Sequence, residues 1–107
     1  MSREGWMVSY DADKDEGWIG HAEPSNLADT RFPFQHGPIQ DNGVNGIQNE
    51  EVIELLIIRL RALNERFPCR ENSLAITKLE EAQMWLDKRT ALRQEQNVEG
   101  KNEAHKS

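Results

Sequence analysis

The sequence is poor in cysteine and in long apolar runs, and each shortage excludes a class of protein. Cys69 is the only cysteine, so no intrachain disulfide and no zinc site built from several thiolates can form. A reducing compartment fits this composition. The chain also shows no basic segment followed by an apolar stretch, and no run long enough to cross a bilayer. We therefore expect a cytoplasmic protein.

Basic residues are also in short supply. The chain has 13 Lys and Arg against 19 Asp and Glu, which gives a formal net charge of −6. A protein that wraps duplex DNA or RNA needs an excess of positive charge to neutralise phosphates, so this class is disfavoured. A small phosphorylated ligand held in a locally basic pocket remains compatible with the composition.

Groupings of residues that carry catalysis are missing. His21, His36 and His105 are far apart and lack the spacing of a shared metal site. The acidic run 11–16 has some likeness to a calcium loop, but its glycine falls one position late, which favours a solvated acidic loop. No nucleophile–base pair and no Gly-rich phosphate loop is visible. We therefore expect a binding protein without catalytic residues, metal or cofactor.

The N-terminal part of the chain shows little regular pattern. Residues 1–30 are acidic and have no helical period, which predicts an irregular arm, although 7–10 and 18–19 have weak strand character. In the next segment Pro33 and Pro38 forbid a helix and favour an edge strand. Paired Asn and Gly residues then predict turns. The expectation is a short strand and a shaped loop that lead into a helix.

Two helices are predicted in the C-terminal half. The first begins at Asn49, a good N-cap, and runs to about Arg66, where the following Phe-Pro pair breaks it. The second is expected to begin near Asn72 or Ser73 and to fade after Leu92. Their short connection makes them antiparallel neighbours.

The predicted fold class is α+β and mainly α: a C-terminal antiparallel helical hairpin preceded by a short strand and turn segment. We divide the chain into an irregular acidic N-terminal arm (1–30), a strand/turn plus helical-hairpin domain for ligand binding and oligomerisation (31–93), and a disordered polar tail (94–107).

The first helix predicts a homo-oligomer, because its apolar residues form a band far wider than one packing partner requires. Burying an Ile or Leu contributes roughly 1.5 to 3 kcal/mol. A monomer that exposed Ile53, Ile57 and Ile58 would therefore forgo several kcal/mol and present a sticky patch.

The start of the second helix is the best candidate for ligand binding. Arg70, Asn72, Thr77 and Lys78 gather within two turns, where free backbone N–H groups and the helix dipole favour an anion. The two cations suit a phosphate, and the amide of Asn72 suits a base or sugar edge. Ordinary helix capping and surface charge remain the simpler explanation from chemistry alone.

Two sequence blocks carry a resemblance to a known family. The runs Phe34-Gln-His-Gly-Pro-Ile-Gln-Asp-Asn-Gly-Val-Asn-Gly and Cys69-Arg-Glu-Asn-Ser-Leu-Ala-Ile-Thr-Lys, with the Met84-Trp-Leu block that follows, resemble the phage-encoded anti-Thoeris and anti-CBASS sponge proteins. The resemblance covers about 31–93. It implies a helical-hairpin domain in an oligomer, often a hexamer in that family, that binds a signalling nucleotide such as glycocyclic ADP-ribose or a cyclic di- or trinucleotide. The nucleotide is held intact, so the host effector is starved of its signal.

The resemblance also implies roles for particular residues. Asn72 matches a ligand-contacting position of the family motif, and Arg70, Thr77 and Lys78 match neighbouring positions. Related sequences often place an aromatic residue followed by Gln at the end of the first helix, where this chain has Leu63-Asn64.

This departure bears on which ligand is bound, because an aromatic side chain at Leu63 would stack on it. Phe67 is the candidate substitute. In an oligomer, Arg70 and Arg89 from different chains are expected to meet around one small anion.

The leading hypothesis is thus a phage anti-defence protein that sequesters a host immune nucleotide in the host cytoplasm, without membrane or long nucleic acid as partner. The alternative is a non-enzymatic adaptor that acts through its apolar first helix. A third possibility, an enzyme that cleaves the nucleotide, would release a product.

Overall fold

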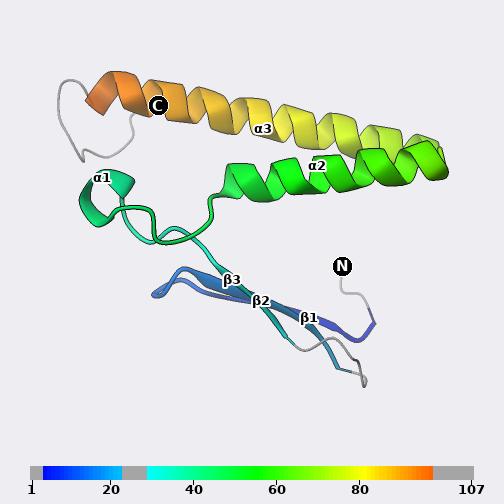
Figure 1. The fold of residues 1–107 in the computed structure, drawn as a ribbon, viewed down its shortest axis with the longest axis horizontal. Helices are drawn as coiled ribbons and strands as arrows, with labels where there is room; N and C mark the ends of the chain where they lie inside the picture. Colours follow the sequence, from blue (N-terminus) through cyan, green and yellow to red (C-terminus); the bar gives the residue numbers. More distant parts are fainter. Residues whose placement is uncertain (1–3, 23–28, 98–107) are drawn as a thin grey trace. The chain divides into compact units, whose positions relative to one another are not determined.

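A computed structural model of the chain describes residues 4–22 and 29–97 (Figure 1). The chain divides into two compact units, Met1–Gln48 and Asn49–Ser107. The first unit holds a sheet and a short helix, and the second is a helical hairpin. In chain order the elements are β1 (Trp6–Asp11), β2 (Glu16–His21), β3 (Thr30–Pro33), α1 (Ile39–Asn42), α2 (Asn49–Arg66) and α3 (Arg70–Asn97). The predicted α+β, mainly α class is confirmed.

The three strands form one antiparallel sheet in the order β1-β2-β3. Strand β1 pairs with β2 from Trp6 opposite His21 to Asp11 opposite Glu16. The expectation of an irregular arm is therefore wrong over residues 6–21. Most of β1 is exposed on both faces, so it lacks the apolar–polar alternation by which a half-buried strand is recognised.

The turn between β1 and β2 depends on two aspartates. The Asp11 carboxylate accepts hydrogen bonds from the backbone N–H groups of Asp13 (2.9 Å) and Lys14 (3.2 Å). Asp15 adopts a left-handed conformation with φ 55°, which Asp tolerates better than most residues. The acidic run thus serves to close a hairpin.

Strand β3 leads into the predicted loop. The N–H of Ile47 donates to the carbonyl of Pro33, and its own carbonyl accepts from the N–H of Gln35, each at 2.8 Å. These bonds form a parallel bridge beside β3. Gly46 makes the close approach possible, because a Cβ there would lie 2.4 Å from the backbone of Phe34.

Helix α2 has the predicted bounds, but α3 differs at both ends. It begins at Arg70 because Cys69 takes the capping role expected of Asn72 or Ser73, as described below. It continues to Asn97 because residues 93–97 include good helix formers and neither Gly nor Pro. Residues 94–97 are therefore not part of a disordered tail, and the rest of that predicted tail lies outside the described residues.

The hairpin packs along a single seam (Figure 1). Its centre on α2 is Ile57, 4% exposed, the one buried apolar side chain in the described part of the chain. Half-buried positions repeat three and four residues apart on both helices, which is the spacing of helices packed lengthwise. On α2 and α3 these seam positions include Ile53, Ile57, Leu60, Asn64, Asn72, Ile76, Leu79, Gln83 and Leu86.

Both helices keep apolar side chains outside this seam. On α2, Leu55 is 65% and Ile58 is 54% exposed, and on α3 Trp85 is 58% exposed. The wide apolar band predicted for the first helix is thus left uncovered by α3. No helix in the described part of the chain is long and apolar enough to span a membrane.

Candidate ligand-binding site

The turn between α2 and α3 is fastened by Asn64. Its side-chain oxygen accepts a hydrogen bond from the N–H of Cys69 (3.0 Å), and its side-chain nitrogen donates to the hydroxyl of Ser73 (3.2 Å). The α2 helix closes at the same place, where the N–H of Phe67 donates to the carbonyl of Leu63 at 2.8 Å. One amide thus joins the end of α2 to the first turn of α3.

Cys69 occupies the N-cap position of α3. The N–H of Asn72 donates to its sulfur at 3.4 Å, and the N–H of Ser73 donates to its carbonyl at 3.2 Å. The thiol is free and exposed. Since sulfur is a weak acceptor, Cys is not read as a cap from sequence. The N–H groups of Arg70 and Glu71 lie in the first turn and have no partner within the helix.

Arg70 and Asn72 both lie in the first turn of α3, two residues apart, so their side chains point to different sides of the helix. Arg70 is exposed and Asn72 is half-buried on the side of the seam. Within the described residues Arg70 forms no ion pair, and the Asn72 side chain forms no hydrogen bond. Both side chains are therefore free to contact a ligand, and their part in a site stays a prediction.

The side chains of Thr77 and Lys78 already have partners within α3. The Thr77 hydroxyl donates to the carbonyl of Ser73 at 3.1 Å. The ammonium of Lys78 lies 3.8 Å from the carboxylate of Glu81 in an exposed pair. An exposed pair of this kind contributes little and yields readily to a phosphate.

Leu63 and Phe67 flank the same turn. Leu63 is half-buried, whereas Phe67 is 71% exposed and so presents its ring to solvent. Arg89 lies on α3 roughly 28 Å along the axis from Arg70, at about 1.5 Å per residue. One hairpin therefore does not bring the two arginines together. Arg89, like Arg70, is exposed and forms no ion pair with any described residue.

Several residues that organise the hairpin were missed from the sequence. Besides Asn64, an exposed ion pair joins Arg61 to Glu80. At the other end, the side chain of Gln83 donates to the carbonyl of Glu50 at 3.1 Å, and the Thr90 hydroxyl donates to its carboxylate at 3.3 Å. The only sequence signal that could have indicated these contacts was the position of Gln83, a polar residue, on the apolar stripe of the second helix.

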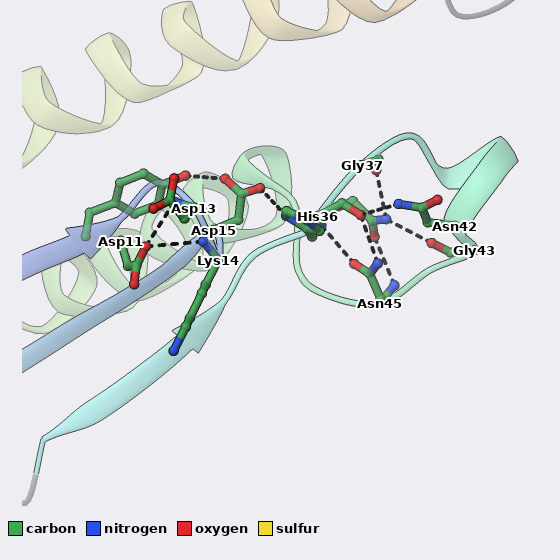
Figure 2. Close-up of polar contacts among 11 residues, drawn as sticks. Asp11, Asp13, Lys14, Asp15, His36, Gly37, Asn42, Gly43 and Asn45 are labelled. Carbon is green, nitrogen blue, oxygen red and sulfur yellow. Dashed lines mark hydrogen bonds and ion pairs between the residues drawn. The ribbon is translucent and has the colours of Figure 1, made fainter.

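A second polar cluster lies in the first unit (Figure 2). The phenol of Tyr10 donates to one oxygen of Asp15 at 2.5 Å, and the other oxygen lies 2.8 Å from Nδ1 of His36. The hydrogen bond from Tyr10, followed by that from His36, lowers the pKa of the Asp15 carboxyl. The same bond to Asp15 raises the pKa of Tyr10.

Amide side chains hold the loop that carries His36 (Figure 2). The side-chain nitrogens of Asn42 (3.1 Å) and Asn45 (2.9 Å) donate to its carbonyl, and its N–H donates to the Asn45 side-chain oxygen at 2.8 Å. Gln35 adds a bond to the carbonyl of Gly43 at 2.8 Å. The Gln and Asn residues between 35 and 45 thus have a structural role, because they hold this loop in shape. No group of His, Cys, Asp and Glu that could hold a metal is present among the described residues.

Comparison with known proteins places these features in context. A family model described as "Acb2/Tad1, hairpin domain" matches residues 27–91, which is more than half of the chain and includes β3, α1, α2 and most of α3. The chain is also 55% identical, over 71 residues, to the protein "Thoeris anti-defense 1" of Bacillus phage SBSphiJ7. The alignment covers 65% of this chain and 50% of the relative. The chain thus spans about half the length of this curated relative.

Proposed function

The chain belongs to the Acb2/Tad1 hairpin-domain family, and from this premise we propose that it is a phage anti-defence protein that binds a host immune signalling nucleotide and holds it without degrading it. The family match over the hairpin carries the proposal. The name of the phage relative points the same way, because it describes an anti-defence protein directed at Thoeris.

The hairpin offers chemistry that suits a nucleotide phosphate. Arg70 and Arg89 are exposed cations without an ion-pair partner in the described residues, and a guanidinium binds phosphate with two parallel hydrogen bonds. Asn72 supplies an amide that can both donate and accept. Phe67 exposes a ring on which a base can stack. No nucleophile–base pair is needed, because sequestration requires affinity alone.

The site proposed here is completed by a second copy of the chain. Nanomolar retention corresponds to a binding free energy of roughly −12 kcal/mol. Solvent-exposed cations on a single helix do not supply this much. The exposed Leu55 and Ile58 of α2 would be covered in an assembly. Such an assembly would bring Arg89 of one copy near Arg70 of another, around one ligand. Glycocyclic ADP-ribose and cyclic di- and trinucleotides are the ligand classes proposed.

Ligand release after heating tests the proposal. The protein is incubated with glycocyclic ADP-ribose isomers and cyclic di- and trinucleotides, filtered, heated, and the released compound is identified by chromatography. We expect one unaltered compound. Recovery of a cleaved compound would instead indicate an enzyme.

The double variant Arg70→Ala, Asn72→Ala should weaken retention by about a hundredfold or more, since it removes at least two bonds and each bond to a charged group contributes roughly 1.5 to 3 kcal/mol. Lys14→Ala is the matched control, because it removes one positive charge from the turn between β1 and β2. A double variant that retains the nucleotide as well as the parent would contradict the assigned site.

The exposed apolar face of α2 favours one second candidate, an adaptor that binds another protein through Leu55 and Ile58. If no compound of the panel is retained by the parent protein, this adaptor function becomes the better account.

A further inference from the structure

Among the described residues, the backbone groups on the outer edge of β1 have no hydrogen-bond partner. Strand β1 ends the sheet order, so only one of its edges faces β2. The N–H of Ala22 donates to the carbonyl of Gly5 at 2.7 Å, in the same register that continues along the two strands. Hydrogen-bonded pairs alternate in antiparallel strands. Trp6, Val8 and Tyr10 therefore direct their N–H and C=O groups away from β2.

Within residues 4–22 and 29–97, this edge lacks the features that normally prevent pairing. No charged residue and no proline lies between Trp6 and Tyr10. The large apolar and aromatic residues of this segment are exposed, from 43% at Trp6 to 76% at Val8. Charged side chains, proline and covering segments are the usual protection of edge strands.

The other edge of the same sheet is protected. Pro33 in β3 has no N–H to offer, and its carbonyl already accepts from Ile47. Arg31 places a charge on β3 and pairs with Glu16. In the part of the chain that the structure describes, the contrast identifies β1 as the edge that is open to a further strand.

We infer that β1 pairs with β1 of a second copy, antiparallel and about a two-fold axis at Val8. In this register Val8 lies opposite Val8 of the second copy, and Trp6 lies opposite its Tyr10. Each of these positions has outward N–H and C=O groups, so every facing pair forms the closely bonded type. The two sheets become one continuous sheet.

The chemistry of the strand favours a second copy over an unrelated partner. The segment is uncharged and therefore does not repel itself, and the proposed register places Asp11 opposite Gly5 rather than opposite another acid. Aromatic pairs and paired β-branched residues are favourable across antiparallel strands. The pairing also places the exposed faces that carry Trp6, Val8 and Ile19 next to each other on one side of the continuous sheet. Together they form a larger apolar surface than either copy has alone.

A charge swap at the axis tests the register directly. Val8→Lys and Val8→Glu each place two like charges opposite one another in the pair, so each alone should raise the dissociation constant of this contact by roughly tenfold. An equimolar mixture of the two should recover the parent's affinity, because unlike charges then face each other. Val8→Thr is the matched control: it keeps the branched shape and adds no charge. Light scattering and native mass spectrometry give the assembly masses.

Amide exchange supplies a readout that contacts between helices do not affect. In the pair, the N–H groups of Trp6, Val8 and Tyr10 should exchange roughly a hundredfold more slowly at high than at low protein concentration. The N–H of Ser9, which bonds within the sheet, should stay protected in every variant and so reports that the sheet is intact. The inference is overturned if the Val8 amide exchanges at an unprotected rate at every concentration, or if the mixed variants associate no better than each alone.

Discussion

Asp15 joins three parts of the first unit through its own atoms. Its carboxylate accepts from Tyr10 and pairs with His36, while its carbonyl accepts from the N–H of Phe34 at 2.9 Å. A φ of 55° is unfavourable for most residues other than glycine, although Asp tolerates it better than most. These contacts stabilise the left-handed backbone of Asp15, so the charge of its carboxylate bears on the turn between β1 and β2.

The acid and alkaline limits of stability should both depend on Asp15. Its hydrogen bonds, first from Tyr10 and then from His36, lower its pKa in the folded state, so its contribution is complete above about pH 4 and is lost as the pH falls through the lowered pKa. The bond to Asp15 raises the pKa of Tyr10. That contribution is complete below about pH 10 and is lost as the pH rises through the raised pKa.

Urea unfolding followed by tryptophan fluorescence between pH 2 and 11 measures both arms, with the pH values chosen about the ordinary pKa of each group. Asp15→Asn should flatten the dependence at both ends. Asp13→Asn is the control, because among the described residues Asp13 uses only its backbone N–H in the turn. An unchanged profile in Asp15→Asn would refute the assignment.

At the scale of the element, the helical hairpin depends on Asn64 for its turn. Asn64→Ala removes the acceptor of the Cys69 N–H and the donor to Ser73. The loss should destabilise the chain by about 1 to 2 kcal/mol, which lowers the thermal midpoint by several degrees. Circular dichroism at 222 nm measures it.

Asn72→Ala is the informative comparison, because its side chain forms no hydrogen bond with a described residue. It should change stability much less while weakening nucleotide retention. If Asn72→Ala were the more destabilising of the two, the roles assigned to these amides would be reversed.

The same elements differ in how far their sequence determines them. Helix α2 was predicted with its bounds, because Asn49 is a recognisable start and Pro68 a recognisable stop. The start of α3 was not, since Cys69 is a weak acceptor. Strands β1 and β2 are specified by their pairing with each other, and β1, which is mostly exposed on both faces, carries little local signal.

The candidate site shows the same limit. That Arg70 and Asn72 share the first turn of α3 follows from their spacing of two residues. The bond from Asn64 to Cys69 depends on how the turn closes, and the relation of Arg70 to Arg89 depends on contacts between copies. Neither is a local property of the sequence.

At the scale of the whole molecule, a net charge of −6 opposes self-association while uncovered apolar side chains favour it. Charge repulsion is screened by salt, whereas apolar burial is not weakened by it. Association of the chain should therefore strengthen as ionic strength rises. The β1 contact is isologous and closes on a pair of copies, so assemblies larger than a pair form only when the outer face of α2 joins further copies as well.

Mutations should disrupt the two interfaces independently of each other. Leu55→Gln with Ile58→Gln leaves the seam intact, because both side chains are exposed, and Gln is compatible with a helix. Each substitution removes roughly 1 to 2 kcal/mol of apolar burial. Each should therefore raise the dissociation constant of the helical interface by about tenfold or more. Glu54→Gln, on the same helix and also exposed, is the control. Multi-angle light scattering should then find a smaller assembly in the helix variant and in Val8→Lys, and a monomer when the two are combined. A helix variant with the parent's mass at micromolar concentration would show that the apolar face of α2 is not where copies of the chain meet.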